Sequence, residues 1–219
     1  MLSVLSPGTA RASEPVNRPG FTVTIVAPET SVAGPAAVVA YQGPIAYPMA
    51  ENLAEIVASL PPDTERLMLD LDSEGGSLAQ AVAAIETLLR AASRFRLETR
   101  IGHGRKCLSS CIPIFMQGRR RIASSASVWL LHGGCGPMTN VPSEKATQTY
   151  IRLLRQGGIA VEFLSMLECA GYFTEPGALW LSGYQLFHVH KAGIITELLP
   201  DWHPERPVVP PFDPNVRAR

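Results

Sequence analysis

The feature that most constrains the fold is a strand pattern that runs directly into a helix pattern within residues 67–93. Residues 67–73, LMLDLDS, form an apolar run with the length and composition of a buried strand. A turn containing Gly75 and Gly76 follows, and then LAQAVAAIETLLRAAS, whose strong helix formers and apolar spacing predict an α-helix. A strand and a helix joined by so short a turn predict a β-α unit in which the helix packs on a sheet.

Similar patterns surround this unit. Residues 21–27, 36–43 and 97–101 are strand candidates, and residues 49–60 have the apolar spacing of a helix that ends at a proline pair. Strands that alternate with helices imply right-handed crossovers. The predicted fold class is therefore α/β, with a largely parallel sheet and helices packed around it.

The second half of the chain continues the alternation. Residues 127–134, SVWLLHGG, have a hydrophobic strand pattern, and residues 145–156 and 159–170 have helix patterns. Residues 180–193 predict a further helix, which breaks at Gly193. We expect the basic run Arg119 to Arg121 to lie in a solvated turn.

Length and composition indicate one domain with two irregular ends. A chain of 219 residues, 46% of them hydrophobic, can bury one good core, which we expect to span residues 21–199. Residues 1–20 are predicted to be disordered or the remnant of a signal peptide, because Ala10-Arg11-Ala12 looks like a cleavage site. The proline-rich residues 200–219 are expected to form an extended tail. The cleavage-like site favours a periplasmic or otherwise exported protein, with a cytoplasmic location as the alternative.

The charge balance argues against several classes of partner. The chain has 19 basic and 19 acidic residues, so its net charge is zero. Nothing therefore suggests nucleic acid or an anionic membrane surface as the main partner. No run reaches the roughly 18 apolar residues that a spanning helix needs, so no integral membrane segment is expected.

A serine pair lies between two cysteines in residues 102–118, GHGRKCLSSCIPIFMQG. Ser109 follows a strand and a glycine-bearing loop and precedes an apolar helix pattern, so we expect it at a strand-to-helix junction. Unpaired backbone N–H groups and the positive end of the helix favour negative charge there. Ser109 is a candidate nucleophile on this ground, although a serine at such a junction could also simply cap the helix.

Two further motifs are expected at the same edge of the sheet. Ligands of parallel sheets bind beyond the carboxyl ends of the strands, where the turn at Gly75 and Gly76 lies. Its N–H groups could approach a substrate as an oxyanion hole requires, or the glycines could serve only a tight turn. His132 ends a strand ahead of two glycines and could act as general base, although lone histidines at strand ends are more often structural.

The cysteines leave three possibilities open. They are Cys107, Cys111, Cys135 and Cys169. Cys107, Cys111 and Cys135 are candidates for a disulfide, but a chain of this size does not require one. Cys107 and Cys111 would be one turn apart if both were helical, an uncommon setting for a mutual bridge, and a zinc site would also need His103 or His132. Thiols packed in the core are the simplest expectation.

Taken in order, these motifs resemble the proteolytic subunit of Clp protease and its periplasmic relatives in the Clp-protease/crotonase superfamily. The resemblance is carried by LDSEGGS, CLSSC with its apolar run to Gly118, VWLLHGG and WLSGYQLFHVHKAGIIT, and it covers roughly residues 36–197. It implies the fold of repeated β-β-α units that this superfamily shares. In that family the nucleophile lies nine residues before a glycine, as Ser109 does before Gly118. The flanking cysteines resemble those of the periplasmic, uncharacterised branch.

The resemblance implies a serine protease that cleaves a peptide or protein substrate without a cofactor. Ser109 would be the nucleophile, His132 the general base, and the backbone N–H groups of Gly76 and Ser110 the oxyanion hole, with Gly75 in the same turn. The region after His132 forms the handle that packs subunits into rings in this family, which implies a homo-oligomer.

The third member of the triad is less clear, because no aspartate lies between Ser73 and Pro200. Glu175 is the nearest acid and could orient His132, or it could be a solvated loop residue. A serine-histidine dyad fits without it. A serine-lysine pair that uses Lys106, an inactive binding or scaffold protein with the same fold, and a crotonase-like acyl-CoA enzyme are the alternatives.

Overall fold

The computed structural model describes residues 18–26, 35–135, 142–174 and 177–200. The strands are β1 (Phe21–Val26), β2 (Ala36–Gln42), β3 (Arg66–Asp72), β4 (Arg96–Ile101), β5 (Lys106–Leu108), β6 (Arg120–Ala123), β7 (Val128–His132), β8 (Ala178–Ser182) and β9 (Glu197–Leu198). The helices are α1 (Met49–Ser59), α2 (Leu78–Ala91), α3 (Cys111–Phe115), α4 (Glu144–Gln156), α5 (Val161–Cys169) and the short π-helix η2 (Gln185–Val189). The expectations for residues 1–20 and 200–219 fall almost entirely outside the described ranges.

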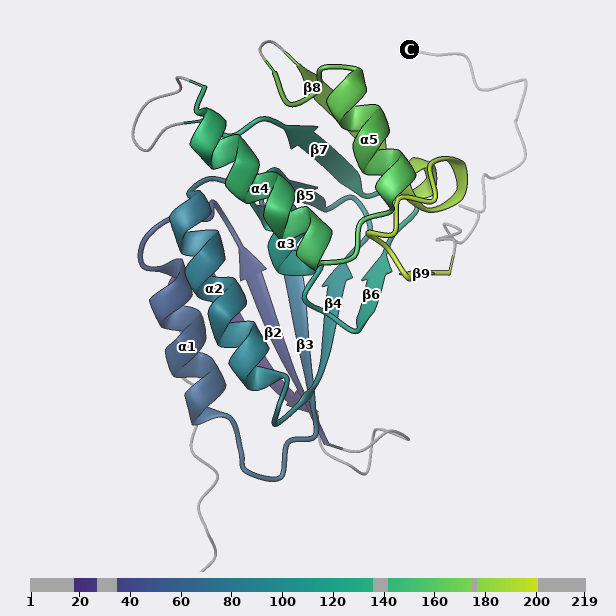
Figure 1. The fold of residues 1–219 in the computed structure, drawn as a ribbon. Helices are drawn as coiled ribbons and strands as arrows, with labels where there is room; N and C mark the ends of the chain where they lie inside the picture. Colours follow the sequence, from purple (N-terminus) through teal and green to yellow (C-terminus); the bar gives the residue numbers. More distant parts are fainter. Residues whose placement is uncertain (1–17, 27–34, 136–141, 175–176, 201–219) are drawn as a thin grey trace, which may run out of the picture.

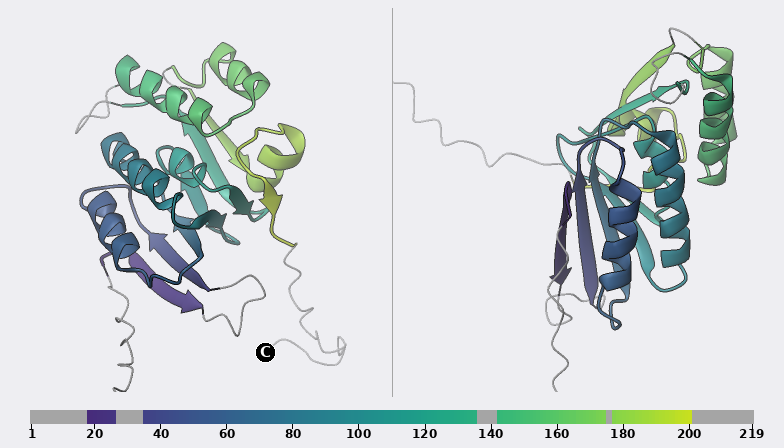
Figure 2. Two further views of the ribbon diagram at one scale, coloured as in Figure 1. Left: turned by 60° about the horizontal axis from the view of Figure 1, so that its bottom comes forward. Right: turned by 90° about the vertical axis from the view of Figure 1, so that its left-hand side faces the viewer.

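The larger sheet has six strands in the order β1-β2-β3-β4-β6-β9. Every neighbouring pair is parallel except β1 and β2. The helices α1 and α2 lie together on one face of this sheet, as the right-hand view of Figure 2 shows. Leu67, Leu69 and Leu71 alternate along β3 and are fully buried, as expected for the face that packs against helices. The predicted α/β class and the largely parallel sheet are confirmed.

A second sheet of three strands, in the order β5-β7-β8, extends beyond the carboxyl ends of the larger one (Figure 1). The strands β5 and β7 are parallel, whereas β7 and β8 are antiparallel. The helices α4 and α5 lie on one side of this sheet (Figures 1 and 2). Trp129 of β7 is fully buried on the inner side and meets Phe115 of α3 edge-on, with ring centroids 5.0 Å apart. This packing joins α3 to the smaller sheet.

Two residues of the arginine run lie in a strand rather than in the expected solvated turn, whereas Arg119 precedes the strand and is exposed. Arg120 lies in β6 and donates two hydrogen bonds to Glu197 of β9, both of 2.7 Å. Arg121 is half-buried and donates to the backbone oxygens of Met116, Gly157 and Gly193 at 3.5, 3.3 and 2.8 Å. Burial lowers the pKa of Arg121. Strand pairing and these acceptors overcome the polar character from which the turn was predicted.

The helix predicted for residues 180–193 is confirmed only in its middle. Residues up to Ser182 belong to β8, because each residue of Ala178–Ser182 pairs with a residue of β7. Residues 183–189 are helical, and the last five of them form η2. Tertiary pairing has here prevailed over the local pattern. Among the described residues, no helix has the length and apolar character needed to cross a membrane.

Candidate functional site

Ser109 occupies the strand-to-helix junction that the sequence predicts. It follows β5 directly and is separated from α3 only by Ser110. Its φ is 52°, a left-handed backbone conformation that is uncommon for a residue with a side chain. A serine on such a sharp turn between a strand and a helix is a recurrent arrangement for an exposed nucleophile. Sequence patterns predict the junction but not this conformation.

The turn at Gly75 and Gly76 lies against Ser109. A Cβ added to Gly75 would overlap the carbonyl oxygen of Leu108 and lie 2.9 Å from the Cβ of Ser109. Gly75 also has a positive φ of 82°, so both its backbone conformation and its surroundings require glycine. The two loops that were expected to converge on one edge are therefore in contact.

The backbone N–H groups around Ser109 differ in what they bind. The Gly75 N–H donates to the Oγ of Ser73 at 3.1 Å, and the Ser109 N–H donates to the Leu130 oxygen at 2.8 Å. Within the described part of the chain, the N–H groups of Gly76 and Ser110 have no acceptor. Gly76 is exposed, so its N–H can meet a ligand, whereas Ser110 is buried and the N–H of Gly75 is used within the turn.

His132 ends β7, the strand that is hydrogen-bonded to Ser109. Leu108 pairs with Leu130, and the Ser109 N–H donates to the Leu130 oxygen, so Ser109 meets this strand two residues before His132. His132 is partly exposed. No hydrogen bond joins Ser109 to His132 among the described residues. Hydrogen bonds between catalytic groups are often long in the absence of substrate and tighten when it binds.

The position across from His132 on β8 is Ala178. Directly opposed residues in an antiparallel pair point to the same face of the sheet. The residue opposite His132, where an acid could orient the imidazole, is therefore an alanine with only a methyl group. Glu175, the acid named from the sequence, lies outside the described residues.

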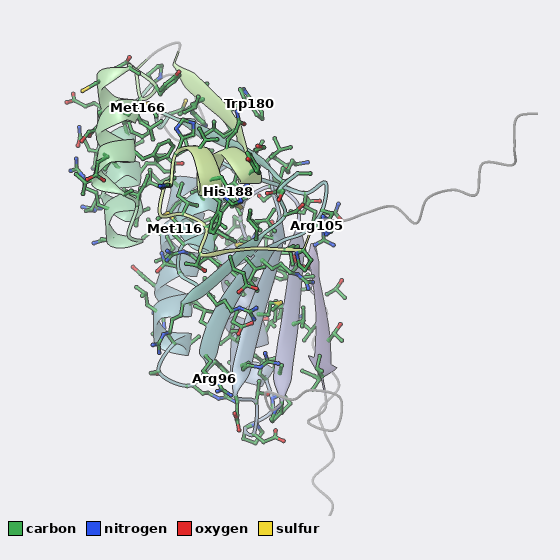
Figure 3. All side chains as sticks on the ribbon, turned by 90° about the vertical axis from the view of Figure 1, so that its right-hand side faces the viewer. Arg96, Arg105, Met116, Met166, Trp180 and His188 are labelled. Carbon is green, nitrogen blue, oxygen red and sulfur yellow. A yellow bond between two sulfur atoms is a disulfide. The ribbon has the colours of Figure 1, made fainter. Side chains whose placement is uncertain are left out.

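The same face of the smaller sheet is apolar around His132. Val128, Leu130 and His132 alternate along β7, and Trp180 of β8 pairs with Leu130. The Trp180 side chain is 57% exposed and projects from β8 at the surface (Figure 3). The neighbours of His132 on this face are therefore apolar.

Charged groups hold the loop that leads into β5. Arg105 and Arg100 make ion pairs with the buried carboxylate of Asp70 at 3.1 and 2.6 Å (Arg105 is labelled in Figure 3). The Lys106 N–H donates to Asp72 at 3.2 Å. The Lys106 ammonium is exposed and lies 4.0 Å from Glu74 in the glycine turn. Lys106 is therefore engaged at the surface, which leaves the serine-lysine alternative without support.

The cysteines differ from the expectation of packed thiols. Cys107 and Cys111 form a disulfide, with Cα atoms 5.3 Å apart. A bridge is uncommon between two cysteines one helical turn apart, but Cys107 lies in a strand and Cys111 begins α3. Cys135 and Cys169 are free and exposed. Their thiols do not form a second bridge.

The described histidines contact other groups of the chain. His103 hydrogen-bonds through Nδ1 to the Oγ of Ser124 at 2.8 Å, and His190 packs against Phe163. Among the described residues, no three or more His, Cys, Asp or Glu side chains are grouped so as to hold a metal ion.

No family model matches this chain, and the search of curated proteins returned no match either. The sequence names Cys107 and Cys111 as candidates for a disulfide without pairing them, and it does not indicate Ala178 as the partner of His132. The CLSSC spacing is compatible with a disulfide when the first cysteine is in a strand and the second begins a helix. Ala178 is identified only by strand register, for which the sequence carries no direct signal.

Proposed function

We propose that this chain is a serine hydrolase of the Clp-protease type, acting on a peptide or protein, with Ser109 as nucleophile and His132 as general base. One observation carries the proposal above the others. Ser109 has a positive φ in a strand-to-helix turn, touches the Gly75 turn, and is hydrogen-bonded to the strand that ends at His132. Helix capping alone requires neither the left-handed conformation nor the neighbouring glycine turn.

The order of the elements supports a Clp-protease/crotonase-like fold. Strand pairs precede helices three times, as β1-β2-α1, β4-β5-α3 and β6-β7-α4, and β3-α2 lies between the first two. This succession agrees with the repeated β-β-α units that the resemblance implies. The fold assignment remains part of the proposal.

The proposed reaction uses groups of this chain alone. His132 takes the proton from the Ser109 Oγ, which attacks the carbonyl carbon of an amide or ester. The N–H groups of Gly76 and Ser110 hold the resulting oxyanion, where each donor is worth about 10²- to 10³-fold in rate. The tetrahedral intermediate collapses when His132 returns the proton to the leaving group. Water, deprotonated by His132, then attacks the acyl ester and releases Ser109.

A fluorophosphonate probe tests this mechanism, because it phosphonylates an activated serine. We expect the wild-type chain to be labelled, with the adduct on Ser109 rather than Ser110 by peptide mass mapping. Ser109→Ala and His132→Ala should abolish labelling, whereas Ser165→Ala, an exposed change on α5, should leave it intact. A folded wild-type chain that takes up no probe would refute the hydrolase proposal.

A non-catalytic binding or scaffold protein is the second candidate. The observation in its favour is the pair His132 and Ala178, since no described carboxylate lies opposite the imidazole. A dyad retains only part of the rate that a full triad provides. Absence of labelling together with saturable binding of unstructured peptides, lost in Gly76→Ala, would select this candidate.

The disulfide also supports the proposed exported location. Structural disulfides persist in oxidising compartments such as the periplasm and are rare in the cytosol. Export is tested by fractionation of cells that express the full chain. Assembly into a homo-oligomer, implied by the resemblance, is tested by measurement of the mass in solution.

A further inference from the structure

A covalent cross-link encloses the proposed nucleophile. Cys107 lies in β5, Cys111 is the first residue of α3, and both side chains are fully buried. The disulfide between them closes a ring that contains Leu108, Ser109 and Ser110. It therefore ties the end of the strand to the start of the helix across the residue that would attack the substrate.

Ser109 has a backbone conformation that its surroundings must impose. The left-handed region is unfavourable for a residue with a Cβ, and it persists at functional sites only where neighbouring structure fixes it. On the strand side, the Leu108 N–H donates to the Ser73 oxygen at 3.0 Å and the Ser109 N–H donates to the Leu130 oxygen at 2.8 Å. These bonds fix the entry to the turn.

The exit from the turn has weaker backbone support. The helix α3 has only five residues, and the side chain of its N-cap residue, Ser110, makes no capping hydrogen bond. Helices this short are unstable on their own and depend on tertiary contacts. The Ile112 N–H donates to the Ser109 oxygen at 2.9 Å. Beyond that bond, packing and the disulfide set the position of Cys111 relative to the strand.

The ring contains two of the groups that the reaction needs. They are the Ser109 Oγ, which attacks, and the Ser110 N–H, which would bind the oxyanion. Displacement of a reacting group by about 1 Å can lower a rate about 10²-fold. A constraint on these three residues therefore acts on the chemical step more than on the binding of substrate.

We propose that the Cys107–Cys111 disulfide is a positioning cross-link that holds Ser109 and Ser110 in their reactive geometry and makes the hydrolase dependent on the oxidised state. This inference rests on the proposed function of Ser109. A dithiol supplies the two electrons and two protons that convert the disulfide to two thiols, and becomes a cyclic disulfide itself. Ser109 is not consumed, so reoxidation restores the site.

The test compares oxidised and reduced forms of the same full-length chain. Fluorophosphonate labelling is followed over a range of probe concentrations, with and without dithiothreitol, and intact mass reports the state of the cysteines. The cross-link is removed in Cys107→Ala/Cys111→Ala. The matched control is Cys135→Ala/Cys169→Ala, which removes the two exposed free thiols and keeps the disulfide. Circular dichroism verifies that each form is folded.

We expect reduction to lower the maximal labelling rate by at least about tenfold with little change in the concentration for half-maximal rate. Reoxidation should restore the rate in wild type and in the control pair. The Cys107→Ala/Cys111→Ala variant should label at the reduced rate under both conditions. If this variant fails to fold, reduced and reoxidised wild type still provide the comparison. Equal maximal rates for oxidised and reduced wild type would overturn the inference.

Amide hydrogen exchange separates this inference from the proposed function. Reduction should speed exchange at the Ser109 amide, inside the ring, and at the Ile112 amide, just after it, since both donate hydrogen bonds at the turn, and it should leave β3 unchanged. If oxidised wild type takes up no probe, the hydrolase proposal fails. In that case, if exchange at the turn is the same before and after reduction, the positioning role of the cross-link is also overturned. Faster exchange at the turn after reduction would support that role.

Discussion

Ala178 faces His132 across the paired strands β7 and β8, and Ala178→Asp is expected to create an acid that orients the proposed base. Opposed residues of an antiparallel pair have Cβ atoms about 4.5–5.5 Å apart. An aspartate at this position can therefore bring a carboxylate oxygen within hydrogen-bond distance of a ring nitrogen. Ala178 is exposed, so the added carboxylate requires no burial of charge.

The expected gain follows from the environment of the new pair. A carboxylate about 4 Å from the imidazolium that forms in the transition state contributes about 1 kcal/mol in bulk water and about 4 kcal/mol near a protein surface. At about 1.4 kcal/mol per factor of ten, these limits correspond to about 5-fold and nearly 10³-fold in rate. Because position 178 is open to water, we expect a gain of about 10- to 100-fold.

The assay is the maximal rate of fluorophosphonate labelling as a function of pH. Ala178→Asn is the matched control, since asparagine has the shape of aspartate without its charge, and it should gain less than about threefold. The pH of half-maximal labelling should move upward in Ala178→Asp, because a nearby negative charge favours the protonated imidazole. If folded Ala178→Asp labels no faster than Ala178→Asn, His132 does not act as base in this register and the reasoning is refuted.

Two further predictions concern the strand β6 and are measured by urea unfolding. Arg121→Ala should lower the free energy of unfolding by about 2–3 kcal/mol, because it removes the guanidinium hydrogen bonds to three backbone oxygens. Arg121→Lys should recover less than half of that loss, since an ammonium lacks the planar fork of the guanidinium. Equal stability of the lysine variant and wild type would contradict this. Hydrogen bonds from Arg120 hold the pKa of Glu197 below its ordinary value, so this pair contributes stability above about pH 4.3 that is lost as the pH falls through the lowered pKa. Both side chains are largely exposed, so Glu197→Gln should lower the free energy of unfolding by less than about 1 kcal/mol at neutral pH and should not change it in strong acid. A loss of stability that persists in acid would argue against the ion pair.

The first half of the fold could be predicted from the sequence because its patterns are long and unambiguous. The run at 67–73 and the following helix pattern match β3 and α2 to within two residues. A buried parallel strand requires a continuous apolar run, and a surface helix requires apolar residues on one side, so few other structures fit either pattern. The meeting of Ser109 with the glycine turn is expected from one parallel sheet. In the structure it arises where β5 of the smaller sheet meets the end of β3 through the parallel bridge between Ser73 and Cys107.

The remaining features depend on pairing that no local pattern records. The strand β5 has three residues, too few for a periodic signal, and it exists because Lys106–Leu108 pairs with β7 while Ser73 bridges to Cys107. If β5 is not recognised, the two cysteines are expected one turn apart on a helix, where a disulfide is uncommon. Similarly, β8 is a strand only because β7 lies beside it. The same pairing makes Ala178 the partner of His132.

The contact between Gly75 and Ser109 supports a last prediction, because the chain offers an unusually close control. Gly75 and Gly158 have nearly the same φ, 82° and 84°, but a Cβ on Gly158 would meet nothing within 4 Å. Gly158→Ala therefore measures the backbone penalty alone, about 1–2 kcal/mol. Gly75→Ala adds a clash with the Leu108 oxygen and the Ser109 Cβ, which forces a backbone shift worth about 1–3 kcal/mol more.

The two variants should differ more in labelling than in stability. A shift of Ser109 by a few tenths of an ångström to about 1 Å lowers the maximal labelling rate by about 10- to 100-fold in Gly75→Ala. Gly158→Ala lies after α4, away from the turn, and should label at the wild-type rate wherever it is folded. Equal labelling of the two variants, at temperatures where circular dichroism shows both folded, would mean that the glycine turn does not position Ser109. Because the comparison holds φ nearly constant, it isolates the contact on which the proposed site depends.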